Sequence, residues 1–252
     1  MRPILFVKIV ASALVAFTAI PSFAAECKEL PNWQSLQNII RSVVPASGTP
    51  SGGLGFPMWI TLVDGSGEVC AVATSLVGGS VTSNIWLGSR IISAQKANTA
   101  NSFSNERLSL STANLYSAVQ PGGSLFGLQE SNPVNAEIAY RGEASKFGTW
   151  NDPITGHRIG GLNVFGGGLT LYRGGVKVGA IGVSGDTSCT DHVVAYKVRA
   201  ALGLNNAPGP LDKMFQDISP PVGSAGISAS GFGHPTCLNN PTAQNSGGSI
   251  VH

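Results

Sequence analysis

The chain has 252 residues, of which 42% are hydrophobic and only 11% are charged, with a formal net charge of +2. This length and apolar content fit a globular domain with a full core. No run of Lys or Arg occurs, so the sequence lacks the positive patch with which proteins bind nucleic acid or anionic surfaces. We therefore expect no nucleic-acid partner.

Residues 1–24 are typical of a secretion signal. Arg2 and Lys8 precede and open an apolar run at 9–20 that is too short to span a bilayer, and a small-residue cleavage site ends at Ala24. Cleavage there would remove both cations and leave a mature chain of zero formal charge. The sequence predicts export to the periplasm or the extracellular space, no membrane insertion and, from the low charge, a homo-oligomer.

The first elements of the mature chain are a helix and a hairpin. Asn32 is a suitable N-cap for a helix through residue 44, and a Pro/Gly/Ser-rich linker follows at 45–55. Apolar segments at 56–63 and 68–76 flank an Asp-Gly-Ser-Gly turn. This pattern predicts an antiparallel hairpin.

The central part of the chain contains small-residue and glycine-rich segments. Ser89 is the expected cap of a helix over 90–103, and residues 111–119 are expected to form a shorter helix. Residues 122–160 are mostly loop, with a possible strand at 137–140.

A second hairpin and a last helix follow. Strands are expected at 169–173 and 176–183, joined by an Arg-Gly-Gly turn, and a helix at 190–204 with its cap among Asp186, Thr187 and Ser188. Hairpins dominate and no βαβ unit is apparent. We therefore predict an α/β (α+β) fold in which an antiparallel sheet is flanked by helices.

The composition changes after Leu204. We therefore divide the chain into the signal at 1–24, one α/β domain at 25–204 and an irregular arm at 205–252, rich in Pro, Gly, Ser and Asn. Residues 239–252 are expected to be disordered.

Four cysteines, an even number in an exported chain, indicate two disulfides rather than a metal site, because no CxxC or HxxxH spacing occurs. Of the three possible pairings we favour Cys27–Cys70 and Cys189–Cys237. Each would join a terminal segment to the central domain.

The turn around Ser184 could serve as a nucleophile, as an anion site or only as a helix cap, and the last two interpretations remain open. A serine nucleophile is disfavoured, because the segment Gly182-Val183-Ser184-Gly185-Asp186 lacks the closing glycine of a nucleophile elbow. The N–H groups at 185–188 either bind a carboxylate or phosphate, or are capped by Asp186 or Ser188.

Two segments, the helix around Ala94-Gln95-Lys96-Ala97 and the glycine-flanked hairpin ending in Val178–Gly185 and followed by Asp191, resemble the GlcG/HbpS-like haem-binding family. That family is related to the C-terminal domain of some cobalamin adenosyltransferases. The resemblance covers about 56–204. It implies a roughly five-stranded, profilin-like antiparallel sheet, an oligomer, and haem or a related tetrapyrrole as the ligand.

The resemblance also implies candidate ligand-binding residues. They are Lys96, Ser184, Gly185 and Asp186. Lys96 is favoured over Arg90 for pairing with propionates, and Arg90 is expected to be solvated. His192 and His234 are candidate iron donors from their chemistry, because imidazole is an axial haem ligand; the resemblance itself supplies no axial histidine. The two would approach one another if Cys189–Cys237 forms, since each lies three residues from its cysteine.

The resulting functional hypothesis is an exported protein that binds haem in order to sequester or deliver it. The alternatives are a haem-degrading enzyme and a cofactor-free extracytoplasmic adaptor or sensor partner. Binding ranks above catalysis, because the sequence contains no evident acid–base pair, metal cluster or activated nucleophile.

Overall fold

The computed structural model describes residues 26–44, 53–77, 83–219, 227–237 and 249–251. The predicted signal at 1–24, most of the predicted linker at 45–55 and much of the segment expected to be disordered lie outside these residues. Within the described part, no helix has the length and hydropathy needed to cross a bilayer.

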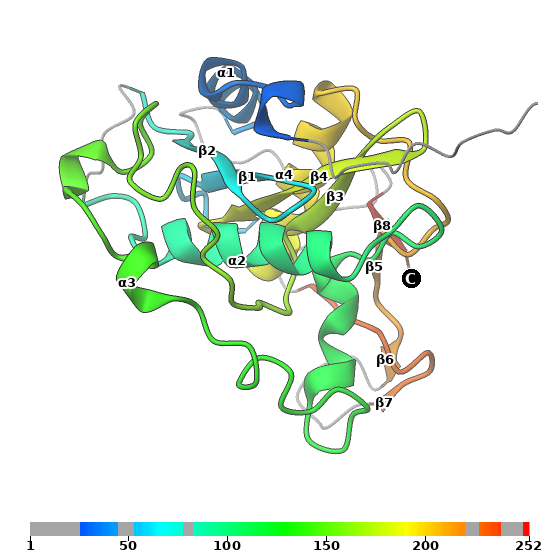
Figure 1. The fold of residues 1–252 in the computed structure, drawn as a ribbon. Coiled ribbons are helices and arrows are strands. Elements are labelled where there is room, and N and C mark those ends of the chain that lie inside the picture. The colour runs from blue at the N-terminus through cyan, green and yellow to red at the C-terminus, as the bar shows by residue number, and fades with distance from the viewer. Residues whose placement is uncertain (1–25, 45–52, 78–82, 220–226, 238–248, 252) are drawn as a thin grey trace, which may run out of the picture.

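An antiparallel sheet with the strand order β2-β1-β4-β3 forms the centre of the molecule (Figure 1). Its strands are β1 (Trp59–Asp64), β2 (Val69–Thr74), β3 (Gly168–Arg173) and β4 (Val176–Ser184). Both predicted hairpins are present, β1–β2 and β3–β4. The fold class is confirmed, but the expectation of about five strands in this sheet was wrong, because the sheet has four.

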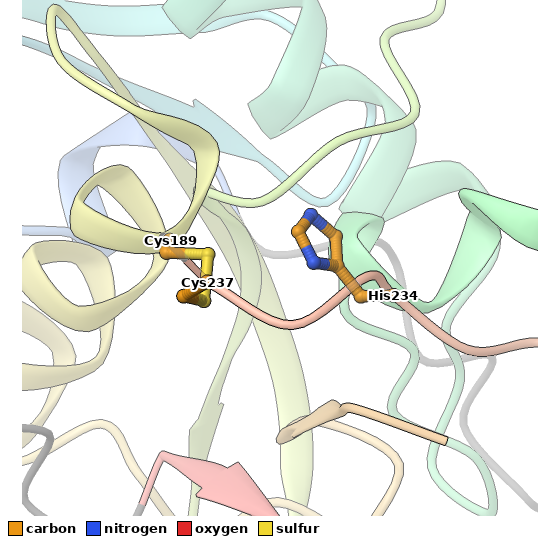
Figure 2. A group of neighbouring side chains, drawn as sticks. All are labelled: Cys189, His234 and Cys237. Atoms are coloured by element: carbon orange, nitrogen blue, oxygen red, sulfur yellow. A yellow bond between two sulfur atoms is a disulfide. The ribbon is translucent and has the colours of Figure 1, made fainter. Parts of the chain in front are cut away.

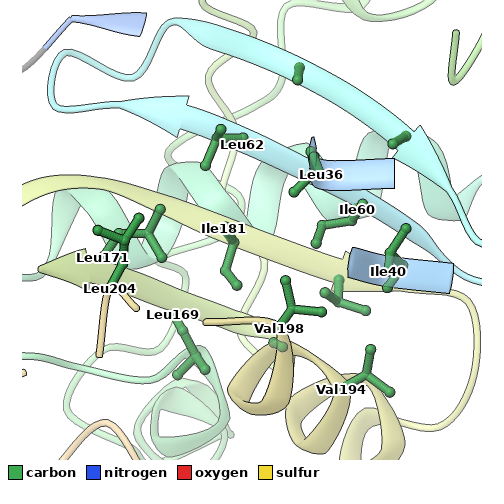
Figure 3. Close-up of a cluster of buried hydrophobic side chains, with 14 of the residues drawn as sticks. Leu36, Ile40, Ile60, Leu62, Leu169, Leu171, Ile181, Val194, Val198 and Leu204 are labelled. Atoms are coloured by element: carbon green, nitrogen blue, oxygen red, sulfur yellow. The ribbon is translucent and has the colours of Figure 1, made fainter. Parts of the chain in front are cut away.

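Helices cover both faces of the sheet. Helix α2 (Ser89–Ser102) packs on one face, and α1 (Trp33–Val43) with α4 (Ser188–Ala201) covers the other (Figure 1). The alternation of strand side chains explains these two layers. On β1, Ile60 and Leu62 point into the core beneath α1 and α4 (Figure 3), whereas Trp59 and Val63 join the cluster beneath α2.

Two of the three main helices begin after an N-cap residue that the sequence predicted. Asn32 accepts a hydrogen bond from the backbone N–H of Ser35, as expected for an N-cap, and Thr187 is the cap of α4. Ser89, however, is the first residue of α2, and Gly88 occupies the N-cap without a side-chain bond.

The prediction of a possible strand at 137–140 was wrong, because the segment forms a helical turn, α3 (Ala136–Ala139). The Asn135 side chain caps this turn by accepting a hydrogen bond from the N–H of Ile138 at 3.2 Å. The short helix expected at 111–119 is instead two 3-10 turns, η2 (Thr112–Leu115) and η3 (Ser117–Val119). The side chain of Asn114 donates to the carbonyls of Leu211 and Lys213, so η2 is shaped by long-range contacts that local periodicity does not reveal. Two further 3-10 turns, η1 (Cys27–Glu29) and η4 (Ala144–Lys146), complete the helical elements of the described residues.

The described part of the C-terminal arm contains four short strands that pair with one another. Strand β5 (Met214–Phe215) pairs in parallel with β8 (Ile250–Val251), and β6 (Ile218–Ser219) pairs with β7 (Ile227–Ser228). Residues 250–251, expected to be disordered, are therefore paired.

Two disulfides join the terminal segments to the domain. They are Cys27–Cys70, with Cα atoms 5.2 Å apart, and Cys189–Cys237, with Cα atoms 6.0 Å apart, the pairs favoured above.

The small residues of α2 allow it to lie unusually close to β4. A Cβ added to Gly182 would lie 1.9 Å from the carbonyl oxygen of Ser93 and 2.5 Å from the nitrogen of Ala97. Both obstacles are backbone atoms of α2, which cannot move aside without displacing the helix. Polar bonds complete the contact, for example Thr61 Oγ1 with Ser93 Oγ at 2.7 Å.

We therefore expect Gly182→Ala to lower the free energy of unfolding by about 3 kcal/mol or more, the upper range for overpacking. Urea unfolding of the oxidised protein measures it. Gly88→Ala is the matched control, because Gly88 has a right-handed helical φ/ψ and open space around its Cβ. Equal stability of the two variants would contradict this packing.

Candidate functional site

A buried ion pair between α2 and α4 lies beneath the turn singled out in the sequence. The Lys96 ammonium donates to Asp191 Oδ2 at 2.6 Å and to the carbonyl of Val183 at 3.0 Å, and it lies 4.6 Å from the centre of the Phe165 ring. Lys96 is 0% exposed and Asp191 is 1% exposed. Lys96 was expected to face a ligand; in the structure its ammonium has protein partners.

Burial acts on the ionisation of both partners. It raises the pKa of Asp191 to about 6, against the opposing pull of the Lys96 ammonium, and burial also lowers the pKa of Lys96. At neutral pH the carboxylate therefore remains ionised and paired.

The triple-glycine segment before β3 makes room for this pair. A Cβ on Gly167 would lie 2.2 Å from the carbonyl of Val183 and 3.0 Å from Lys96 Nζ, and its φ of +120° also favours glycine. A Cβ on Gly168 would lie 2.4 Å from the Lys96 carbonyl. The glycines are therefore a packing requirement of the ion pair, not a nucleotide-binding motif.

A chain of hydrogen bonds runs from the ion pair to the surface. Asp191 Oδ1 accepts from the N–H of Asp186 at 3.0 Å. The Asp186 carboxylate in turn accepts from the N–H groups of Leu54 at 2.9 Å and Phe56 at 3.2 Å. The ion pair thus positions the segment that leads into β1.

The N-terminus of α4 is capped by the protein itself. The N–H of Asp186 is bonded to Asp191, that of Thr187 to the Asp186 carboxylate at 2.6 Å, and that of Thr190 to Thr187 Oγ1 at 3.3 Å. These bonds favour the capping interpretation over an anion site. Ser184 and Gly185 are buried, and a Cβ on Gly185 would lie 2.6 Å from the carbonyl of Pro57.

An exposed apolar surface lies where this chain of bonds ends. We call Leu54, Phe56, Trp86 and Leu87 the aromatic patch. The Phe56 and Trp86 rings are 4.9 Å apart, and Leu54, Trp86 and Leu87 are each about half exposed, at 51%, 49% and 52%. The backbone of Trp86 is held by a bond from the Trp59 indole at 2.8 Å. This patch was not predicted from the sequence, although bulky apolar residues directly before a strand and before a helix were a signal for it.

His192 is fully buried beside the C-terminal arm. Its Nε2 lies 3.1 Å from the carbonyl of Ser249 and its Nδ1 lies 3.2 Å from Ser111 Oγ. Because a carbonyl only accepts, Nε2 carries the proton and Nδ1 accepts from the hydroxyl. Burial lowers the pKa of His192 to about 3, so the ring is neutral.

His234 is also buried and fully bonded. Its Nδ1 donates to the carbonyl of Pro235 at 2.7 Å, its Nε2 accepts from Ser188 Oγ at 2.9 Å, and its ring packs 5.4 Å from that of Tyr116. Burial lowers the pKa of His234. Both candidate iron donors therefore have protein partners at both ring nitrogens.

Arg90 was wrongly expected to be solvated. It is 1% exposed, its Nε donates to Asp152 Oδ2 at 2.9 Å, and its guanidinium lies 3.8 Å from the centre of the Phe147 ring. The ion pair joins α2 to the long loop, because Asp152 lies 62 residues further along the chain. The Asp152 carboxylate neutralises the Arg90 charge, which the helix alone would leave at the surface.

Breaking the central ion pair should be costly in stability. We expect Lys96→Met to lower the free energy of unfolding by about 3–5 kcal/mol, because the Asp191 carboxylate would remain buried and uncompensated. The double variant Lys96→Met/Asp191→Asn should recover part of the loss, since the amide oxygen can still accept from Asp186. A double variant less stable than Lys96→Met, measured by urea unfolding at neutral pH, would contradict the pairing.

The neutral His192 predicts acid sensitivity. Its folded pKa of about 3 lies below the ordinary 6.5, so the unfolded chain binds more protons between these values. The contribution of His192 to stability should therefore be fully present above about pH 6.5 and be lost as the pH drops toward 3, by up to about 1.4 kcal/mol per pH unit, whereas the raised pKa of Asp191 acts in the opposite direction below about pH 6. His192→Gln should have a flatter profile in denaturant unfolding between pH 4 and 7; an unchanged slope would contradict this assignment.

The sequence of this chain matches a known protein family. Residues 46–200, more than half of the chain, match the family described as "Haem degrading protein HbpS-like". A search of the curated proteins gave no match.

Several solved structures show limited similarity. A structure titled as a PduOC:heme complex is 21% identical, with a TM-score of 0.47, covering 71% of this chain and 99% of that one. The Klebsiella pneumoniae protein ORFY is 20% identical, with a TM-score of 0.48 and coverage of 74% and 95%, and a Streptomyces reticuli HbpS double mutant is 16% identical, with a TM-score of 0.43 and coverage of 79% and 99%. From the family match, the chain belongs to the HbpS-like family.

Proposed function

We propose that this chain is an exported haem-binding protein that sequesters or delivers haem. The observation that carries the proposal is the HbpS-like match, which spans both the ion pair and the aromatic patch. The two disulfides are compatible with an oxidising compartment.

The aromatic patch suits one face of a tetrapyrrole. Porphyrin is flat and apolar, and aromatic side chains with one exposed face supply large contact area. In this proposal Phe56 and Trp86 contact the ring system. Lys96 and Asp186 do not contact the ring system; together with Asp191 they position the Leu54–Phe56 segment through their hydrogen bonds, and Ser184 and Gly185 form the buried turn that precedes Asp186.

Bound haem would bring a redox-active iron that accepts an axial protein donor. Of the two candidate donors, His234 is the better placed, because its unprotonated Nε2 is bonded only to the half-buried Ser188 hydroxyl. His192 would have to give up a bond to Ser111 in a fully buried position. Ligation by either ring requires its serine bond to break.

The exposed apolar patch and the zero charge of the mature chain also favour self-association. We propose a homo-oligomer, to be measured by light scattering on the sample used for haem binding.

The family description favours haem degradation as a second candidate function. Turnover of haem distinguishes degradation from binding. An enzyme would destroy the porphyrin absorbance when given oxygen and a reductant, whereas a binding protein would retain it.

Titration of the oxidised mature chain with hemin, followed at the Soret band, tests the proposal. We expect saturation near one haem per chain. Trp86→Ala should weaken binding about tenfold, the effect of losing one buried aromatic anchor. Trp150→Ala is the matched control, because Trp150 is an exposed tryptophan (73%) outside the patch. His234→Ala and His192→Ala should identify the donor from the position of the band.

A titration no different from that of a control protein would refute haem binding and leave the adaptor alternative. Equal weakening by Trp86→Ala and Trp150→Ala would refute the placement of haem on the aromatic patch.

A further inference from the structure

Three potential metal ligands gather at the start of α4. Cys189 lies in the first turn of the helix, and His234 and Cys237 lie on the C-terminal arm that crosses it (Figure 2). One ring nitrogen of His234 and the two sulfur atoms are all within 4.8 Å of one another, and all three residues are buried. Two thiolates and an imidazole are a ligand set that zinc prefers.

One polar neighbour of Cys237 would support a thiolate. The Gln216 side-chain amide donates to Cys237 Sγ at 2.7 Å, although a disulfide sulfur is a weak acceptor. Gln216 is 8% exposed, and its buried Oε1 has no hydrogen-bond partner in the described structure. A buried amide whose donor faces the sulfur would gain a charge-assisted bond if that sulfur became anionic.

His234 offers a ring nitrogen to this cluster, and both ring nitrogens now have protein partners. Nδ1 is bonded to the carbonyl of Pro235 at 2.7 Å and Nε2 to the Ser188 hydroxyl at 2.9 Å, so the nitrogen that ligates the cation must give up its partner. The bond that remains at the other ring nitrogen would orient the imidazole, as is common for ligating histidines.

We propose that reduction of the Cys189–Cys237 disulfide creates a Cys2His site, formed by Cys189, His234 and Cys237, for a thiophilic divalent cation such as Zn²⁺. A dithiol reductant supplies two electrons and two protons, breaks the sulfur–sulfur bond and is itself oxidised to a disulfide. The cation then displaces the two thiol protons and bonds to both sulfur atoms and to the imidazole. A fourth position is left for water.

The site would keep the arm attached to α4 in both redox states. In the oxidised protein a covalent bond joins Cys237 to the helix; in the reduced protein the cation would join the same two residues. The imidazole of His234 is also a candidate haem donor, but the proposed haem binding concerns the oxidised chain, so the two proposals are tested in different redox states.

Cobalt substitution tests the proposal, because a thiolate–Co²⁺ site absorbs strongly by charge transfer. The other disulfide must be removed, since Cys27, Asp64 and Cys70 form a second cluster of possible ligands. We therefore use the full mature chain with Cys27→Ser and Cys70→Ser, titrated with Co²⁺ before and after treatment with a dithiol. We expect no charge-transfer band when it is oxidised and one equivalent of bound Co²⁺, displaced by Zn²⁺, when it is reduced.

Matched variants identify the imidazole. His234→Ala should weaken Co²⁺ binding more than about tenfold, and His157→Ala, which changes a histidine outside the cluster, should leave it unchanged. If the variant with both serines does not fold, the reduced wild-type chain is compared with its His234→Ala variant. The variant should then bind one equivalent of Co²⁺ fewer. Absence of the band after reduction, or equal binding by the two histidine variants, would overturn the proposal.

Discussion

The contact between the Lys96 ammonium and the Asp191 carboxylate connects the layers of this molecule to its candidate ligand surface. Both groups are buried away from water, and in the protein interior either charge alone would be strongly destabilising. Each partner also holds backbone: Lys96 the carbonyl of Val183, and Asp191 the N–H of Asp186. One pair therefore fixes α2, the end of β4 and the start of α4 relative to one another.

That burial explains sequence features that otherwise suggest other functions. The glycines at 166–168 precede a strand, and a Cβ at Gly167 would collide with the atoms that surround the ion pair. Gly182 allows α2 to approach the sheet, so that Lys96 reaches Val183 and Asp191. The small-residue helix and the glycine turn are thus parts of one packing arrangement, which ends at the aromatic patch.

Local patterns predicted the hairpins, the three main helices and the cap at Asn32, because these depend on neighbours in the sequence. They failed where distant partners decide. Arg90 is buried because Asp152 lies opposite it, and η2 is shaped by its bonds to the C-terminal arm. For the candidate site, the sequence identified Lys96 and the Asp186 turn but not the direction of the lysine, since a side chain's partner across the fold has no local signature.

The most direct test of this account is a crystal structure of the oxidised mature protein with hemin. The account predicts porphyrin in contact with Phe56 and Trp86, with the Lys96–Asp191 ion pair intact beneath them. Porphyrin bound at a surface that includes neither ring, or a Lys96 ammonium that has left Asp191 to bind a propionate, would contradict it.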